Sequence, residues 1–268
     1  MNAPNQRPIG IFDSGVGGLT VAASVRKALP SENIIYFGDT ARVPYGNKSR
    51  STVTRFSGQI SDFLVEKNVK AIVIACNTAS SFSQSYLRRN YDLPVIGVIK
   101  PGVEKAVSLS KNGRIGVIGT EAMVSSRAYE KELFKISSKH KLFQESCPLF
   151  VPLVENRMTS GEITSKIAEK YLRPLKRRGI DTLILGCTHY PMLRPVLSEI
   201  LEGVKMVDSS EAVAEALRKV LEERHLLACG KRRKNRTVCY VSDDPLKFGK
   251  ISGMFLKCPV SVRKVVLA

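Results

Sequence analysis

Two cysteines stand in matched sequence contexts that suit proton transfer. Each ends an apolar, strand-like run and precedes hydrogen-bonding residues that open a predicted helix, in Cys76-Asn77-Thr78 and again in Cys187-Thr188-His189. Backbone N–H groups at the start of a helix favour negative charge, so they stabilise the thiolate form of a cysteine placed there. A thiol in such a position can take up and return a proton near neutral pH, which general acid–base catalysis requires.

For either cysteine alone, the alternative is a small buried core residue at a strand end. Two cysteines in one context favour a shared task instead. Inversion of a tetrahedral carbon needs one group to remove a proton from one face and another to deliver a proton to the opposite face. A thiolate is less tightly solvated than a carboxylate, so a dry site penalises it less. The pair therefore predicts proton transfer at a carbon centre.

The polar residues near the first cysteine suit an amino-acid substrate. Asp13 can bind an ammonium group or orient the Cys76 thiol, and the alternative is that it caps a helix beginning near Gly17. The loop Ser14–Gly18 offers backbone N–H groups and close approach, which suits a carboxylate. It matches a dinucleotide-binding fingerprint only in part, because Thr20 stands where the third glycine belongs. We therefore expect no nicotinamide cofactor.

Further candidates lie near the second cysteine and in one central loop. His189 lies two residues after Cys187, close enough to share its proton. A Cys-x-His metal site needs further ligands, and no second cluster supplies them, so we expect no zinc. The turn-rich loop Gly38–Gly46 is of the kind that carries binding residues. Glu155 is a lone carboxylate after an apolar run that we expect to be a strand, with plain surface placement as the alternative.

Short β-branched runs alternate with amphipathic stretches along the chain. We expect strands at 9–12, 33–37, 71–75, 95–98, 114–118, 182–185 and 237–242. We expect helices at 19–29, 49–67, 78–91, 161–178, 191–201, 211–223 and 245–256, with one more between the strands at 95–98 and 114–118. This alternation predicts an α/β fold with parallel sheets covered on both faces.

An internal echo predicts two related halves. The segments Ile9–Gly15 and Ile115–Thr120 both pass from an apolar strand to a polar loop, and each is followed by a strand that ends in a cysteine. We therefore expect two pseudo-symmetric α/β domains, residues 1–97 plus 209–268 and residues 98–208. Ligands of open α/β sheets bind at the carboxyl ends of the strands. We expect the active site in the cleft between the domains, with the cysteines facing each other.

Composition limits the cellular setting. The 268 residues are 43% hydrophobic, with six cysteines and a formal net charge of +18. Apolar runs are too short for a membrane helix, and the N-terminus lacks an apolar leader, so we expect a cytoplasmic protein with free thiols. The densest basic run, Lys231–Arg236, has no interleaved aromatic residues for base stacking. We expect a solvated loop and no nucleic-acid partner, with an electrostatic contact to a polyanion as the alternative.

Several motifs together resemble those of the glutamate racemase family, within the Asp/Glu racemases. The similarity runs from Ile9 to about Val265 and is carried by Phe12–Thr20, Gly38–Gly46, Ala75–Ser80, Ile118–Thr120, Leu153–Glu155 and Leu185–Pro191. Aspartate racemases match this set less well. The sequence departs from the family at Ala122-Met123-Val124, where a threonine is usual in the middle, and in the basic run and high positive charge.

The resemblance implies a cofactor-independent racemase that interconverts L- and D-glutamate and supplies D-glutamate for peptidoglycan. It also implies a homodimer. The implied catalytic residues are Cys76 and Cys187 as acid–bases, assisted by Asp13, His189 and Glu155. The implied substrate-binding residues are Ser14, Asp39, Tyr45, Gly46, Asn77, Thr78, Thr120 and Thr188.

Three other functions remain as alternatives. One is a racemase for aspartate or another amino acid. Another is a Cys/His hydrolase that uses Cys187 and His189, although it leaves the second matched cysteine without a task. The third is a nucleic-acid-binding protein built on the basic C-terminal region, whose binding would weaken steeply with salt.

Overall fold

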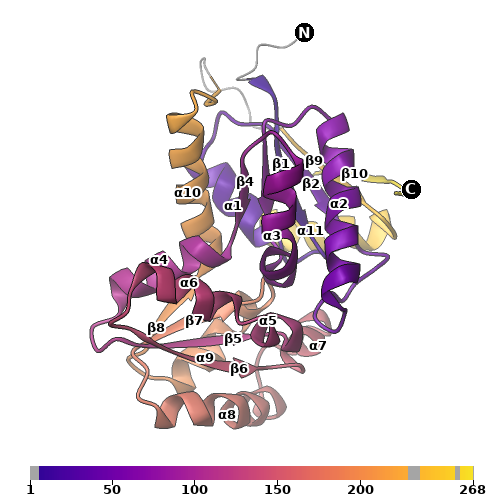
Figure 1. The fold of residues 1–268 in the computed structure, drawn as a ribbon. Helices are drawn as coiled ribbons and strands as arrows, with labels where there is room; N and C mark the ends of the chain where they lie inside the picture. Colours follow the sequence, from indigo (N-terminus) through magenta and orange to yellow (C-terminus); the bar gives the residue numbers. More distant parts are fainter. Residues whose placement is uncertain (1–5, 229–235, 257–259, 268) are drawn as a thin grey trace. The chain divides into compact units, whose positions relative to one another are not determined.

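The computed structural model describes residues 6–228, 236–256 and 260–267, which form two compact units (Figure 1). Unit 1 contains the described residues up to Val98 and from Ser210 onward, and unit 2 contains Ile99–Ser209. Each unit is built on one sheet whose strand pairs are all parallel. The prediction of two parallel-sheet α/β domains is therefore confirmed.

Unit 1 has a six-stranded sheet in the order β10-β9-β2-β1-β3-β4. Its strands are β1 (Ile9–Asp13), β2 (Ile34–Gly38), β3 (Ala71–Ile74), β4 (Val95–Gly97), β9 (Thr237–Val241) and β10 (Ser261–Lys264). Its helices are α1 (Leu19–Ala28), α2 (Arg50–Glu66), α3 (Asn77–Asn90), α10 (Ser209–Glu223) and α11 (Pro245–Leu256).

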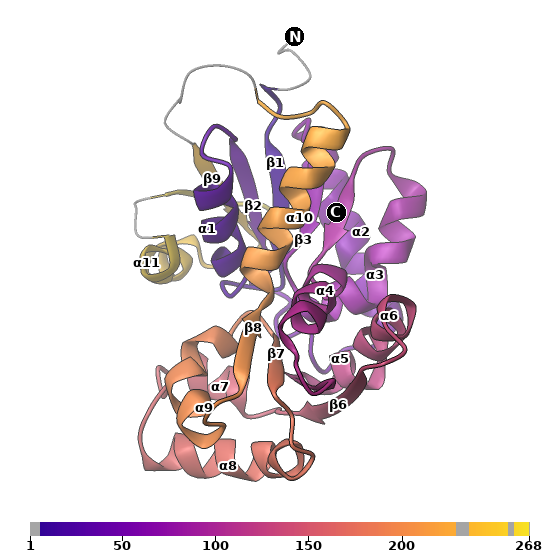
Figure 2. The same cartoon turned by 90° about the vertical axis from the view of Figure 1, so that its left-hand side faces the viewer.

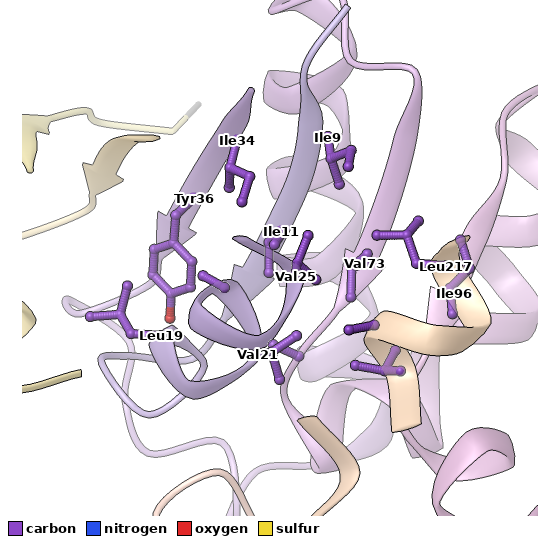
Figure 3. Close-up of a cluster of buried hydrophobic side chains, with 14 of the residues drawn as sticks. Ile9, Ile11, Leu19, Val21, Val25, Ile34, Tyr36, Val73, Ile96 and Leu217 are labelled. Atoms are coloured by element: carbon purple, nitrogen blue, oxygen red, sulfur yellow. The ribbon is translucent and has the colours of Figure 1, made fainter. Parts of the chain in front are cut away.

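Alternation along the strands divides the core of unit 1 between the two faces of the sheet. Ile11 of β1 and Val73 of β3 pack with α1 and α10 in one apolar cluster (Figure 3). Phe12 and Ile74, one residue further along each strand, pack with α2 and α3 on the opposite face. Successive side chains of a strand point to opposite faces. Because both faces are covered, these strands can present polar groups to a ligand only at their ends.

Unit 2 has a four-stranded sheet in the order β6-β5-β7-β8. Its strands are β5 (Arg114–Gly119), β6 (Lys141–Ser146), β7 (Thr182–Gly186) and β8 (Lys205–Asp208). One face packs with α4 (Ile99–Leu109), α5 (Glu121–Ser125) and α6 (Ala128–Ile136). The other packs with α7 (Phe150–Glu155), α8 (Glu162–Arg177), the 3-10 helix η2 (Tyr190–Leu193) and α9 (Arg194–Ile200). Figure 2 shows α8 and α9 on the opposite side of this sheet from α4.

The same strand order recurs in both units and locates their ligand-binding ends. The order β2-β1-β3-β4 of unit 1 corresponds to β6-β5-β7-β8 of unit 2. In such sheets the chain reverses its direction of winding between β1 and β3, and between β5 and β7, and ligands bind at that point outside the strands' carboxyl ends. Asp13 and Cys76 stand at this point in unit 1, and Thr120 and Cys187 stand at it in unit 2.

Two parts of the sequence interpretation need correction. The apolar run before Glu155, expected to be a strand, forms the helix α7 instead, because Phe150 and Leu153 are buried at helical spacing while their neighbours are more exposed. Strands β6, β8 and β10 were not anticipated. Within the basic run, residues 231–235 lie outside the described parts of the chain, and so do Cys229 and Cys258. The described portion contains no helix long and apolar enough to cross a membrane.

A buried ion pair holds the segment that follows α10 against the core of unit 1. Lys70, which precedes β3, and Glu32, which precedes β2, are 0% and 2% exposed, and Lys70 Nζ lies 2.6 Å from Glu32 Oε2. Lys70 Nζ also donates to the carbonyl of Leu226 at 2.7 Å. Glu32 Oε1 accepts from the Ala228 N–H at 2.8 Å. The pair thus fixes the route by which the chain returns toward β9.

Breaking this pair should strongly destabilise unit 1. Glu32→Ala leaves the Lys70 ammonium buried without its carboxylate, and we expect the free energy of unfolding to fall by about 3–5 kcal/mol. The matched control is Glu162→Ala, because Lys166 and Glu162 are also 2.6 Å apart but 72% and 79% exposed. That exposed pair should contribute about 1 kcal/mol or less. Equal losses in urea unfolding of the two variants would contradict the buried-pair account.

Candidate active site

Cys76 lies where β3 passes into α3. It is the N-cap of α3, and its Sγ accepts a hydrogen bond from the Ala79 N–H at 3.5 Å. Its thiol also reaches the hydroxyl of Ser14, with Sγ and Oγ 3.8 Å apart. The side chain is 6% exposed. The predicted contact between this thiol and backbone N–H groups at a helix start is therefore present in the structure.

Asp13 organises the loop that follows β1. It is fully buried, and its Oδ2 accepts from the Gly15 N–H at 3.0 Å. Gly18 is the N-cap of α1 and has no side chain that could cap the helix. A Cβ at Gly18 would lie 2.4 Å from the Asp13 Cβ, so only glycine allows the loop to pass this close. Tyr36 donates to the Gly15 carbonyl at 2.7 Å, and burial followed by the charge of Asp13 raises the pKa of its phenol.

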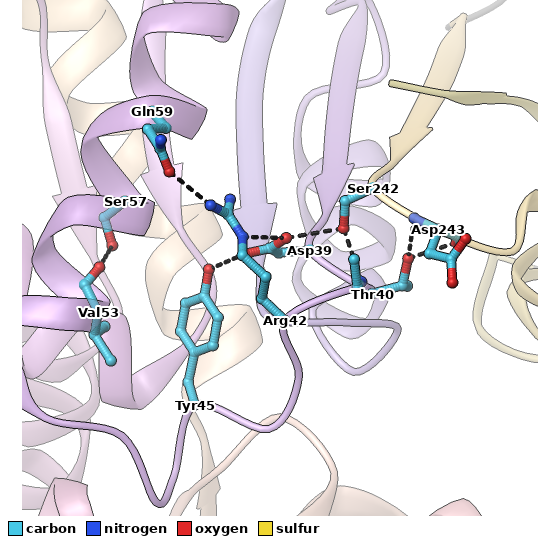
Figure 4. A network of polar contacts seen from close by, with 10 residues as sticks. Asp39, Thr40, Arg42, Tyr45, Val53, Ser57, Gln59, Ser242 and Asp243 are labelled. Atoms are coloured by element: carbon cyan, nitrogen blue, oxygen red, sulfur yellow. Dashed lines mark hydrogen bonds and ion pairs between the residues drawn. The ribbon is translucent and has the colours of Figure 1, made fainter. Parts of the chain in front are cut away.

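Asp39 is the centre of a second polar network in unit 1 (Figure 4). The carboxylate is fully buried and pairs with Arg42 Nε, 2.7 Å from Oδ2. Tyr45 donates its hydroxyl to the same Oδ2, and burial together with the charge of Asp39 raises the pKa of this phenol. Arg42 also donates to Gln59 Oε1 at 2.6 Å. The Asp39 carboxylate therefore holds the loop 39–46 in place, and its oxygens are hydrogen-bonded to other side chains of the same unit.

Ser242 completes this network and was missed by the sequence analysis. Its hydroxyl donates to Asp39 Oδ1 at 2.8 Å and accepts from the Ala41 N–H at 2.8 Å. Ser242 directly follows β9, and β9 pairs with β2 in the register Gly38↔Val241. The strand pairing alone brings Ser242 beside the loop, because more than 200 residues of chain separate them, and no local motif marks the contact.

The other expected substrate-binding residues of unit 1 lie close to these two networks. Asn77 and Thr78 form the start of α3 and are buried, 5% and 3% exposed. Gly46 is half-buried and directly follows Tyr45. Unit 1 thus gathers its candidates at the carboxyl ends of three neighbouring strands. We call this the Cys76 cluster; it comprises Asp13, Ser14, Asp39, Tyr45, Gly46, Cys76, Asn77 and Thr78.

Cys187 follows β7 in unit 2, but its local setting differs from that of Cys76. A turn and the short helix η2 come next, and α9 begins only at Arg194, so this thiol does not cap an α-helix. Its Sγ instead lies 3.8 Å from His189 Nδ1. Both side chains are buried, 8% and 4% exposed. Both cysteines therefore follow the end of a strand, as expected. The groups that contact their sulfur atoms differ, contrary to the expectation.

His189 links this thiol to a carboxylate. Its Nε2 lies 3.4 Å from Glu155 Oε1, and the Glu155 side chain is 46% exposed. A carboxylate at this distance favours a proton on Nε2, which leaves Nδ1 to accept the Cys187 proton. Glu155 is therefore neither a plain surface residue nor a strand residue, because α7 directs its carboxylate to the histidine.

Two threonines and one further cysteine complete the surroundings of Cys187. Thr120 caps α5, and its hydroxyl accepts from the Met123 N–H at 3.2 Å. Thr188 is buried beside Cys187. Cys147 follows β6 and is fully buried; burial, Glu145 and Cys187 raise the pKa of its thiol, which suits a core residue and not an acid–base. We call Thr120, Glu155, Cys187, Thr188 and His189 the Cys187 cluster.

Neither cluster has the composition of a metal centre. Across the described ranges, no three His, Cys, Asp or Glu side chains are grouped as metal ligands. The four cysteines within those ranges, Cys76, Cys147, Cys187 and Cys239, are free thiols. What the two clusters offer is one buried thiol each, with hydroxyl, amide and carboxylate groups around it.

Comparison with known proteins decides the family. The family model for Asp/Glu/Hydantoin racemase matches residues 19–217. A glutamate racemase of Geobacter metallireducens is 47% identical over 93% of both chains. The chain belongs to the Asp/Glu/Hydantoin racemase family. This confirms the family resemblance inferred from the sequence motifs, and with it the expectation of an isomerase.

Solved structures agree with this family assignment. A glutamate racemase isoform from Bacillus anthracis superimposes with a TM-score of 0.94 at 37% identity, covering 97% of this chain and 98% of that one. A glutamate racemase from Francisella tularensis, solved in complex with D-glutamate, gives a TM-score of 0.91 at 40% identity with the same coverage. The whole described fold of this racemase, not one domain of it, is therefore shared.

The Asp39 network gives a test of how the racemase positions its loop. Ser242→Ala removes a hydrogen bond to a buried carboxylate, which is worth about 1.5–3 kcal/mol, so we expect kcat/KM to fall by about tenfold or more. Ser242→Thr keeps the hydroxyl and should retain most of the activity. Racemisation followed by circular dichroism, with thermal unfolding measured on the same samples, separates positioning from loss of fold. Full activity of Ser242→Ala would show that the loop does not depend on this bond.

Proposed function

We propose that this racemase interconverts L- and D-glutamate by proton transfer at Cα between Cys76 and Cys187, without a cofactor. The observation that carries the proposal is that one buried cysteine follows β3 in unit 1 and one follows β7 in unit 2. Each of these thiols contacts a group able to stabilise its negative charge. Cys76 accepts from a helix N–H, and Cys187 lies against His189. The similarity to glutamate racemases, one of them solved with D-glutamate, supports glutamate as the substrate.

The reaction needs the two sulfurs in opposite protonation states. For one enantiomer, the thiolate of one cysteine removes the α-proton, and the thiol of the other donates its proton to the opposite face of the planar carbanion. The sulfurs exchange protonation states, and no proton is gained or lost overall. Because the second proton comes from a different atom, the configuration at Cα inverts.

The residues around each thiol divide the remaining work. His189 accepts and returns the Cys187 proton through Nδ1, while Glu155 fixes its tautomer. Asp13 holds the loop that brings Ser14 to Cys76. The substrate carboxylates accept hydrogen bonds from the short polar groups at the strand ends: Ser14, Asn77, Thr78, Thr120 and Thr188, with the loop of Tyr45 and Gly46, held by Asp39, closing over them.

The cellular role follows from the family resemblance. We propose that the product D-glutamate supplies peptidoglycan synthesis, that the enzyme acts in the cytoplasm, and that it works as a homodimer. The domains that carry the two thiols are residues 1–97 with 209–268, and residues 98–208. Glutamate is an anion, so the net charge of +18 also favours its approach.

The test uses racemisation of L-glutamate by purified protein with chelator and a carbonyl-trapping reagent present, followed by circular dichroism. We expect full activity in the wild-type protein and little on L-aspartate. Cys76→Ser and Cys187→Ser should each lose racemisation severely, because a serine hydroxyl is too weakly acidic for either role. The control is Cys147→Ala, a buried cysteine outside the reaction. Activity that depends on an added cofactor, or that survives in either Ser variant, would refute the mechanism.

A further inference from the structure

A surface cavity between α2 and α3 has a lining that the racemase reaction does not use. It is a shallow depression of about 760 Å³, open to solvent, and is lined by Ser49, Arg50, Ser51, Thr54, Arg55 and Tyr86. Two guanidinium groups and three hydroxyls therefore face one space, beside the half-exposed ring of Tyr86. Among the described residues, neither Arg50 nor Arg55 forms an ion pair with a carboxylate.

Both arginines lie over aromatic rings. The guanidinium carbon of Arg50 lies 5.6 Å from the centre of the Phe82 ring, and that of Arg55 lies 5.4 Å from the centre of the Phe56 ring. Stacking on a ring leaves the edge of a guanidinium group, with its N–H donors, free to bind. That edge matches two oxygens of a phosphate group. The cavity thus offers an anion the N–H edges of two guanidinium groups, while the hydroxyls of Ser49, Ser51 and Thr54 are already hydrogen-bonded within the protein.

The Tyr86 ring adds a flat apolar contact next to these donors. It lies over α2, where a Cβ on Gly58 would come within 3.6 Å of the ring. A flat ring beside a phosphate site suits a ligand that carries a planar base, because a base stacks on an aromatic side chain at about 1–3 kcal/mol.

We propose that this cavity binds a nucleoside monophosphate, with its phosphate on Arg50 and Arg55 and its base on Tyr86. Binding is linked to the racemase reaction through Phe56. The guanidinium carbon of Arg42 lies 4.0 Å from the centre of the same ring that Arg55 contacts, and the Tyr45 ring lies 5.8 Å from it. Phosphate bound to Arg55 offsets its charge at the Phe56 ring and so changes the environment of Arg42, which holds Asp39 and the loop 39–46.

The binding site is tested on the full chain with adenosine 5′-monophosphate, by calorimetry. We expect Arg50→Gln/Arg55→Gln to weaken binding by about tenfold or more, and adenosine or inorganic phosphate alone to bind more weakly than the nucleotide. Tyr86→Leu should remove the advantage of the nucleotide over phosphate. The matched control is Arg173→Gln/Arg177→Gln, which removes the same charge from a second cationic cavity, on α8, of about 440 Å³.

Each outcome decides one part of the proposal. Equal weakening by the two double variants would show unspecific attraction to a cationic protein and overturn the site, as would phosphate binding as tightly as the nucleotide. The absence of nucleotide binding to wild-type protein would also overturn it.

The link to catalysis rests on the proposed function and has its own measurement. Saturating nucleotide should change the KM for glutamate in the wild-type protein, and glutamate should change the nucleotide Kd by the same factor, since coupling is reciprocal. Phe56→Leu should lose the effect of nucleotide on KM, while nucleotide binding, which Arg50 and Tyr86 also carry, stays measurable by calorimetry. An unchanged KM in wild-type protein would refute the link. Nucleotide binding without any racemisation would instead refute the proposed function and leave the site standing.

Discussion

Both candidate clusters depend on one constraint, the complete burial of parallel strands on both faces of a sheet. In β1, Ile11 and Phe12 point into different apolar clusters, and in β3 Val73 and Ile74 do the same. A strand of this kind has no solvent face on which a polar side chain could stand without losing its hydrogen bonds to water. Reactive groups are therefore confined to the carboxyl ends of the strands, where the chain turns into a helix and leaves donors unpaired.

The two thiols reach the same topological place by different local chemistry. Cys76 is the N-cap of a 14-residue helix and receives a backbone N–H. Cys187 precedes only a turn and a four-residue 3-10 helix, and a histidine backed by a carboxylate stands beside it instead. A helix N-terminus stabilises a fixed negative charge, whereas an imidazole can itself take the proton. The repeated sheet thus gives the two cysteines equivalent positions, and the loops place different groups beside each sulfur.

Local sequence patterns predicted the fold and the position of Cys76 and Cys187 at strand ends, because both follow from short segments. The alternation of apolar runs gave the parallel sheets, and the Cys-polar-polar motifs marked the strand ends. Such patterns could not predict hydrogen bonds between residues that come together only through strand pairing. Ser242 reaches Asp39 because β9 lies beside β2. The apolar run before Glu155 was expected to be a strand, because so short a run has too few turns to show helical spacing. The burial of Phe150 and Leu153 in the core shows that it is a helix.

The central claim is that Cys76 and Cys187 act on opposite faces of one substrate carbon. Elimination of a leaving group from the β-carbon needs only one base, on the face that carries the α-proton. The deciding measurement presents both enantiomers of a β-chloro glutamate analogue to Cys76→Ser and to Cys187→Ser, and follows release of chloride and keto acid. Each variant retains one thiol, so each should eliminate from one enantiomer, and the two variants should prefer opposite enantiomers. The same preference in both variants would place the two thiols on one face of the substrate and contradict the account.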